Sequence, residues 1–331
     1  MNQTRLDRFL QRSEVDMVLE QLRLFGIDLP RHPQDMQDEW SLPFMRWVVA
    51  ETTSGMEAAI GREDPPGVIL STHRDIVCDP ALYNLARVEA GLDTTHIVLG
   101  TNLAGIPWVK EIMQLNKALF IDRSATGRAA LEQQISLSNQ IAEVVADGGK
   151  VWIAQSPGRT KNGVDKTHPA ILRMLGLAHG GEKEGADVLS GLVRAVAIRY
   201  DVNPCDARVV AERIRGEKVA EDDVVSMLEG LRGWKGKVRL AESAPLSFSG
   251  MTGKEGWLEA ANAVNRSLAE LPVRGAWANA AEKELRMGTG VENPALADRV
   301  EDIGAKVSNM MPGTDLEKIK ECALEFYREE V

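Results

Sequence analysis

The spacing of apolar residues divides the chain into a helical beginning, a middle in which strands and helices alternate, and a helical end. Between residues 6 and 25, apolar side chains recur three or four positions apart, which predicts a helix. Residues 43–56 predict a second helix, and residues 61–67 (G-R-E-D-P-P-G) predict a linker. From Gly253 onward the pattern is helical throughout, and the last predicted helix covers residues 315–330.

Between the linker and the helical end, short apolar runs alternate with helical patterns. Such an alternation is typical of crossover units, which build a largely parallel sheet. We therefore expect an α/β fold with a mixed, largely parallel sheet that is covered by helices and has helical extensions at both ends. The expected domains are a helical segment over residues 1–62, an α/β domain over residues 63–250, and C-terminal helices over residues 251–331 that pack on it. Strands are predicted at residues 68–71, 96–100, 118–121, 151–154, 192–200 and 238–241, and helices at residues 81–89, 107–115 and 126–146.

Composition and charge narrow the classes of function. The 331 residues are 44% apolar and carry a formal net charge of -10, so we expect no nucleic-acid partner, which would require a basic face. Cys78, Cys205 and Cys322 lie far apart without metal-ligand spacing, which favours a reducing, cytoplasmic location. The first residues lack the apolar stretch of a signal peptide, and no run of about 18 apolar residues occurs. Any membrane contact is therefore expected to be peripheral, on the inner face of a membrane.

Polar residues gather where three predicted strands end. Because parallel strands present their carboxyl ends at one edge of a sheet, we expect these residues to meet there. A histidine can take a proton from an alcohol, a nearby carboxylate can orient its ring, and an arginine can grip a phosphate with two hydrogen bonds. The pattern thus indicates a general base facing a substrate with a hydroxyl and a phosphate. The residues are His73, Asp75 and Asp79 in the first loop, Arg123 and Ser124 in the second, and Gly158, Arg159 and Lys161 in the third.

Two features have two interpretations each. Asp79 followed by Pro80 is also the usual beginning of a helix, with Asp as N-cap and Pro in the first helical position. One carboxylate can cap a helix and orient a histidine at once. Similarly, the stripe of Trp40, Phe44 and Trp47 either lies at a lipid surface or packs on the main domain.

Four segments resemble the glycerolipid acyltransferases, which acylate glycerol 3-phosphate or lysophosphatidate. The resemblance covers roughly residues 67–206, and the order, spacing and strand context of the segments agree with the family. The third segment is most similar to the soluble plastid type of glycerol-3-phosphate acyltransferase. The segments are S-T-H-R-D-I-V-C-D-P, T-N-L-A-G-I-P-W-V-K-E-I-M-Q-L-N-K-A-L-F-I-D-R-S, V-W-I-A-Q-S-P-G-R-T-K-N-G and V-R-A-V-A-I-R-Y-D-V-N-P-C-D.

Two positions depart from the family pattern. The first motif of the family is His, four residues, then Asp, but Cys78 stands at that place here and Asp79 follows one residue later. We align Asp79, which keeps the following Pro80, with the family aspartate, and hold Asp75 in reserve. Many members have Glu before the Gly-Arg of the third motif, where this chain has Pro157. The plastid type also lacks that Glu.

The resemblance implies transfer of a fatty acyl group from a thioester, on acyl carrier protein or coenzyme A, to a hydroxyl of glycerol 3-phosphate or its 1-acyl derivative in phospholipid biosynthesis. His73 would be the general base and Asp79 would orient it. No nucleotide-binding, zinc or nucleophile-elbow motif is present in the sequence, and we expect no cofactor and no metal. The alternatives are a non-catalytic lipid-phosphate-binding or scaffold protein on the same fold and, third, a hydrolase that uses His73. The acceptor would be held by Arg123, Ser124, Gly158, Arg159 and Lys161.

Overall fold

The computed structural model describes residues 2–122, 124–217, 219, 222–288 and 290–328. Among these residues, seven strands form one sheet in the order β1-β7-β6-β2-β5-β3-β4. Strands β2 to β6 run parallel, β7 runs antiparallel to β6, and β1 runs parallel to β7. The strands are β1 (Met56–Ala59), β2 (Gly67–Ser71), β3 (His96–Gly100), β4 (Ala118–Ile121), β5 (Lys150–Ala154), β6 (Val193–Tyr200) and β7 (Val238–Glu242).

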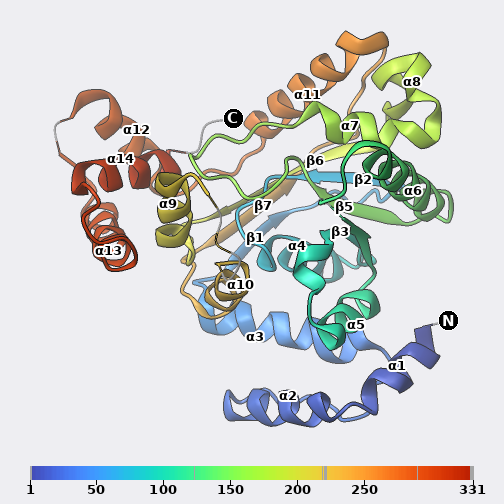
Figure 1. The fold of residues 1–331 in the computed structure, drawn as a ribbon, viewed down its shortest axis with the longest axis horizontal. Helices are drawn as coiled ribbons and strands as arrows, with labels where there is room; N and C mark the ends of the chain where they lie inside the picture. The colour runs from blue at the N-terminus through green and yellow to red at the C-terminus, as the bar shows by residue number, and fades with distance from the viewer. Residues whose placement is uncertain (1, 123, 218, 220–221, 289, 329–331) are drawn as a thin grey trace.

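Helices cover both faces of the sheet, and each face has an apolar core of its own (Figure 1). Successive side chains of a strand point to opposite faces, so neighbours in sequence enter different cores. Leu70 and Ile153 join the core under α6, α7 and α11, whereas Ile69 and Trp152 join the core under α3 and α4. The mixed, largely parallel sheet with helices at both ends is thereby confirmed. The longer helices, each of eight or more residues, are α1 (Asn2–Leu10), α2 (Ser13–Leu24), α3 (Leu42–Thr52), α4 (Cys78–Glu89), α5 (Pro107–Leu115), α6 (Gly127–Ala146), α7 (Pro169–Gly176), α9 (Asp206–Arg215), α10 (Asp222–Arg232), α11 (Gly253–Glu270), α12 (Ala278–Met287), α13 (Pro294–Met310) and α14 (Leu316–Tyr327).

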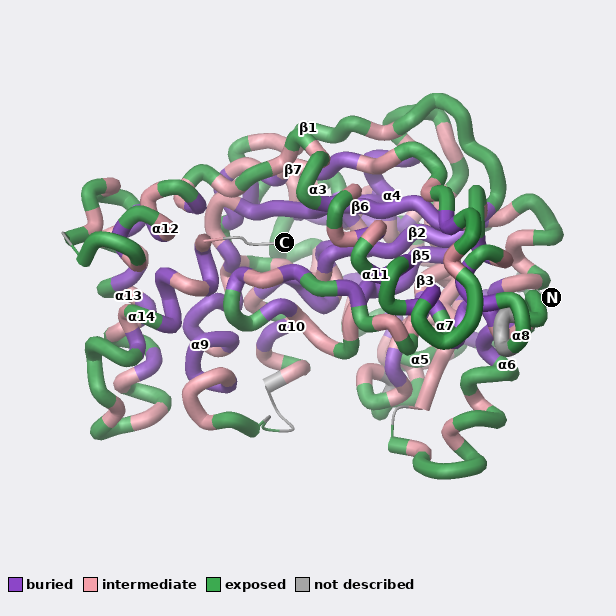
Figure 2. Tube along the Cα trace, turned by 90° about the horizontal axis from the view of Figure 1, so that it is seen from above, coloured by how far each residue is buried: buried purple, intermediate pink, exposed green. Residues whose placement is uncertain are grey.

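The two ends of the chain add smaller cores beside the sheet. At the C-terminal end, α12, α13 and α14 pack with α9, while strands β2, β5 and β6 remain buried in the middle of the molecule (Figure 2). At the N-terminal end, Trp40 is buried near Phe9, and its indole N–H donates to the Pro30 carbonyl at 2.8 Å. The aromatic stripe therefore packs inside the protein at Trp40. None of the helices in the described part of the chain combines the length and the apolar character needed to span a bilayer.

Two of the predicted N-terminal helices differ from the structure. The helix predicted from residue 6 to 25 is two helices, α1 and α2, separated at Gln11 and Arg12. The helix predicted through Met56 ends at Thr52, where the Thr52 hydroxyl donates to the Val48 carbonyl, and Gly55 turns the chain with a φ of 124°. Met56 then begins β1, which pairs with β7. The sequence M-E-A-A has no strand character of its own, so this strand exists because β7 offers it a partner.

Candidate active site

The loop after β2 brings His73 and Asp79 together. His73 Nδ1 lies 3.0 Å from Asp79 Oδ2, and the Asp79 side chain is fully buried. The same Oδ2 accepts the backbone N–H groups of Arg74 at 2.6 Å and Asp75 at 3.0 Å, while the Tyr200 hydroxyl donates to Oδ1 at 2.7 Å. These bonds fix the carboxylate in one orientation. A histidine that donates from Nδ1 to a carboxylate carries its lone pair on Nε2, ready to accept a proton.

Asp75, and not Asp79, accepts the backbone N–H groups at the start of helix α4. The Asp75 Oδ1 atom accepts the backbone N–H groups of Val77 at 2.9 Å and Cys78 at 2.7 Å. The helix begins at Cys78 rather than at residue 81, so Asp79 lies inside its first turn and its side chain returns to the loop before it. The expectation that Asp79 caps the helix with Pro80 in the first helical position is therefore wrong. The structure pairs His73 with Asp79, whereas the side chain of Asp75 bonds the backbone where α4 begins.

Replacing Asp75 with alanine should lower the free energy of unfolding by about 0.5–2 kcal/mol, the usual worth of an N-cap side chain. Asp75→Asn keeps an oxygen for the cap and should leave both stability and turnover close to normal. Burial and the charge of Asp79 raise the pKa of the Asp75 carboxyl above its value in the unfolded chain. The free energy of unfolding of the wild type therefore falls as the pH rises from the unfolded-state pKa through the raised folded-state pKa. Asp75→Asn should flatten this loss. Denaturant unfolding across a pH series measures both effects.

A different result would reassign the pair. If Asp75→Asn abolished turnover while the protein stayed folded, Asp75 rather than Asp79 would be the functional partner of His73.

The loop after β5 reaches the same edge of the sheet, because β5 is the neighbour of β2. Gly158 and Gly163 have φ values of 84° and 71°, which other residues rarely adopt, and they let this loop curve tightly. The Thr160 N–H donates to the His73 carbonyl at 2.8 Å and ties the two loops together. His73, Gly158 and Arg159 consequently line one pocket of about 60 Å³, called here the His73 pocket.

Arg159 is a buried cation whose hydrogen bonding is incomplete. Its side chain is 6% exposed, its Nη2 donates to the Ser226 hydroxyl at 3.2 Å, and Nη2 lies 4.0 Å from Glu212 Oε2. Its Nη1 is buried and has no hydrogen-bond partner within the described part of the chain. Buried donors are nearly always paired, so a bound anion would supply the missing acceptor. Lys161 lies at the rim, 44% exposed, with Nζ 2.9 Å from Glu212 Oε1.

The second loop does not join the first and third. Strand β4 stands at the edge of the sheet, with β3 and β5 between it and β2. Ser124 is exposed, its N–H and hydroxyl both donate to Asp122 Oδ1, and it does not line the His73 pocket. The structure therefore does not bring Ser124 together with His73 and Arg159, and its role in substrate binding stays a prediction. Arg123, predicted to bind phosphate, lies outside the described residues.

Several residues of the site were not predicted. The rings of Trp152 and His73 are arranged edge to face, with centroids 6.1 Å apart, and the Tyr200 hydroxyl, from β6, donates to Asp79. Tyr200 ends the strand predicted at residues 192–200, so its place at the carboxyl edge of the sheet was a usable signal. Glu212 and Ser226 come from α9 and α10, whose amphipathic patterns give no sign of a role at the site.

An apolar pocket of about 300 Å³ adjoins the His73 pocket. The two pockets share Ile76, Leu99 and Leu103 in their walls. This pocket, called here the α3–α5 pocket, lies on the sheet face that α3, α4 and α5 cover. Its other walls include Leu42, Met45, Pro80, Ile97, Val109 and Ile112.

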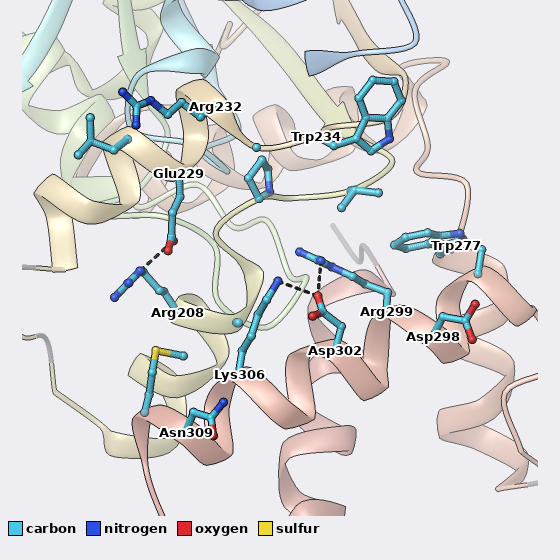
Figure 3. A pocket seen from close by; sticks show the side chains of 17 residues that line it. Arg208, Glu229, Arg232, Trp234, Trp277, Asp298, Arg299, Asp302, Lys306 and Asn309 are labelled. Atoms are coloured by element: carbon cyan, nitrogen blue, oxygen red, sulfur yellow. Dashed lines mark hydrogen bonds and ion pairs between the residues drawn. The ribbon is translucent and has the colours of Figure 1, made fainter. Parts of the chain in front are cut away.

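A larger hollow of about 900 Å³ lies between α9, α10 and α13 (Figure 3), and its walls contain neither His73 nor Arg159. Three of its cations are held in ion pairs within its walls. Arg208 lies 2.8 Å from Glu229, and Asp302 accepts from both Arg299 at 2.5 Å and Lys306 at 2.8 Å. Arg208, Arg299 and Lys306 are therefore already neutralised, and the described residues that line the hollow include no histidine, so the smaller His73 pocket is the better candidate for the reaction.

The site combines a histidine–carboxylate pair, a buried arginine that lacks one acceptor, and an apolar pocket. Residues 54–189 match the family model described as Acyltransferase. This matched segment contains β1 to β5, with His73, Asp79 and Arg159, and ends before β6. No curated protein matches the chain. A solved structure that is similar is the 1-acyl-sn-glycerophosphate (LPA) acyltransferase PlsC from Thermotoga maritima, with a TM-score of 0.41 and 16% identity over 82% of this chain and 89% of that chain.

Proposed function

We propose that the protein transfers a fatty acyl group from a thioester to a hydroxyl of glycerol 3-phosphate or of its 1-acyl derivative. The observation that carries the proposal is one small pocket lined by His73 and by Arg159, whose buried Nη1 lacks an acceptor. The adjoining α3–α5 pocket offers apolar walls to an acyl chain. The match of residues 54–189 to the acyltransferase family supports the same reaction.

The proposed chemistry needs one base and no acyl-enzyme. The acceptor hydroxyl gives its proton to His73 Nε2 while its oxygen attacks the carbonyl carbon of the thioester. The carbon–sulfur bond then breaks, and the sulfur leaves as a thiol with the proton that His73 held. Asp79, fixed by four hydrogen-bond partners, stabilises the imidazolium in between. Such positioned proton transfer commonly contributes about 10²- to 10⁴-fold in rate.

The phosphate of the acceptor is proposed to bind against Arg159, with Lys161 at the rim. Without an acceptor, Glu212 lies between these two cations and offsets their mutual repulsion. A phosphate that reaches Nη1 of Arg159 adds a charge-assisted hydrogen bond without displacing Ser226 or Glu212.

A non-catalytic lipid-phosphate binder on the same fold is the second candidate. Its main argument is the spacing between His73 and Asp79, which is one residue longer than in the family. The 3.0 Å contact between the two side chains weakens that argument, because the loop absorbs the extra residue and the pair still forms.

The deciding experiment offers purified protein two donors, acyl-coenzyme A and acyl carrier protein carrying the same chain, and two acceptors, glycerol 3-phosphate and 1-acylglycerol 3-phosphate. The proposal expects an ester product with at least one pair. Acceptor binding without any product would establish the non-catalytic binder, and release of free fatty acid in the absence of acceptor would establish a hydrolase.

Arg159→Ala should raise the KM for the phosphorylated acceptor by about 10- to 150-fold, since a hydrogen bond to a charged group is worth about 1.5–3 kcal/mol. Stability should change little, because the Glu212 carboxylate keeps Lys161 as its partner. The exposed Arg286 of α12 provides the control, and Arg286→Ala should leave KM unchanged. Steady-state kinetics with the phosphorylated acceptor and with the same acceptor lacking its phosphate group measure the effect. An equal loss with the unphosphorylated acceptor would show that Arg159 does not bind phosphate.

A further inference from the structure

Strands β3 and β5 separate from each other next to the His73 pocket, and this separation is called here the fork. The ladder between β3 and β5 consists of two rungs, His96 with Val151 and Ile97 with Trp152, and continues no further. The neighbouring ladders are longer. Strand β5 stays paired with β2 as far as Ala154, and β3 stays paired with β4 as far as Gly100. The carboxyl halves of β3 and β5 therefore diverge in an otherwise continuous sheet.

The fork separates the His73 pocket from a second apolar pocket on the opposite face of the sheet. Val98 of β3 and Ala154 of β5, which follow the last rungs, line both pockets. The second pocket, called here the α6–α7 pocket, has a volume of about 330 Å³, similar to that of the α3–α5 pocket. The side chains that make it apolar come from β4, β5, α6 and α7, among them Ile121, Ala130, Leu137, Ile153, Ile171 and Met174.

The turn that carries Arg159 borders both pockets. Ser156 and Pro157 line the α6–α7 pocket, and Gly158 and Arg159, the next two residues, line the His73 pocket. A glycerol phosphate held at Arg159 consequently lies beside the fork. The α3–α5 pocket meets the His73 pocket at another wall, through Leu99 and its neighbours, and can take the chain of the donor.

We propose that the acceptor already bears one acyl chain, which passes through the fork between β3 and β5 into the α6–α7 pocket. This inference rests on the proposed function and selects, between its two acceptors, the single-chain glycerol phosphate over glycerol 3-phosphate. The two chains of the product then lie on opposite faces of the sheet, one in each apolar pocket. The site needs both apolar pockets because the donor and the acceptor each bring one acyl chain to the same reaction.

The first test is a series of 1-acylglycerol 3-phosphates of increasing chain length, assayed as monomers with a saturating donor. Each methylene buried in an apolar pocket favours binding by about three- to fourfold. The KM should fall by that factor per methylene until the pocket is full, and glycerol 3-phosphate should have the highest KM of the series. Equal KM values across the series, or a lower KM for glycerol 3-phosphate, would overturn the proposal.

A pair of tryptophan substitutions on α6 locates the chain. Ala130 is half-buried and lines the α6–α7 pocket, whereas its neighbour Ala129 is exposed and does not. A130W should raise the KM for a long-chain acceptor at least tenfold and leave the KM for glycerol 3-phosphate and for the donor unchanged. A129W should change none of these values. An increase in the donor KM with A130W would assign the pocket to the donor and refute the inference.

Photolabelling separates this inference from the proposed reaction. A 1-acylglycerol 3-phosphate with a diazirine at its chain end is bound together with a non-hydrolysable acyl thioester analogue, and the labelled residues are mapped by mass spectrometry. Labelling of Met174 or Leu137 supports the inference even if no transfer occurs, in which case the proposed reaction alone fails. Transfer activity with labelling confined to the α3–α5 pocket, at residues such as Met45, overturns the inference and keeps the reaction.

Discussion

Replacing His73 with alanine should lower turnover by about 10²- to 10⁴-fold, the usual contribution of a positioned general base. The loss should appear in kcat, because the imidazole acts on the hydroxyl proton in the transition state and not on the phosphate. Folding should be preserved, since the His73 backbone keeps its bond from Thr160 and the neighbouring carboxylate keeps Tyr200. Single-turnover acyl transfer measured beside a thermal melt tests both statements.

Added imidazole provides the matching control for His73→Ala. It should restore part of the lost turnover, because the substitution leaves space beside Asp79 for a free ring. A variant with normal kcat would show that His73 is not the base, and the non-catalytic interpretation or a different base would then have to replace it.

Asp79→Asn should lower kcat by about 10- to 100-fold with little change in melting temperature. The amide oxygen can stand where Oδ2 lies and keep the N–H groups of Arg74 and Asp75, while its NH₂ can donate to a reversed Tyr200 hydroxyl. The fold therefore keeps its hydrogen bonds. The imidazolium of His73, however, would face a neutral amide, and a hydrogen bond between charged partners is worth about 1.5–3 kcal/mol.

Asp75→Asn is the matched control for Asp79→Asn, because both remove one buried negative charge from the same loop. The two variants should differ mainly in kcat and hardly in stability. A normal kcat in Asp79→Asn would show that the pairing seen in the structure does not serve the reaction.

The fold was largely predictable because buried parallel strands are continuous apolar runs. The strands at residues 96–100 and 118–121 were predicted with the bounds that the structure has, and most others within one residue. The strand that escaped prediction, Met56–Ala59, is short and mostly exposed, and it depends on pairing with β7. Tertiary pairing of this kind leaves no periodic signal in the sequence.

The sequence predicts only those site residues that lie in the segment directly after a strand. His73 and Arg159 follow strands that turned out to be neighbours, whereas Ser124 follows the edge strand. Spacing alone could not decide between Asp75 and Asp79, because both lie within reach of the histidine and both side chains bond backbone N–H groups. The contacts of Arg159 come from α9 and α10, which only the folded chain brings there.

The position of β2 has a consequence for dissecting the molecule. This strand leads to His73 and has β5 on one side and β6 on the other, but β6 begins at Val193, beyond the segment that matches the family model. A chain cut at residue 189 would turn β2 into an edge strand, with its unpaired N–H and C=O groups and apolar side chains open to other chains. It would also lose the Tyr200 hydroxyl that steadies Asp79. The smallest piece able to fold alone must therefore extend past the segment that the family model matches.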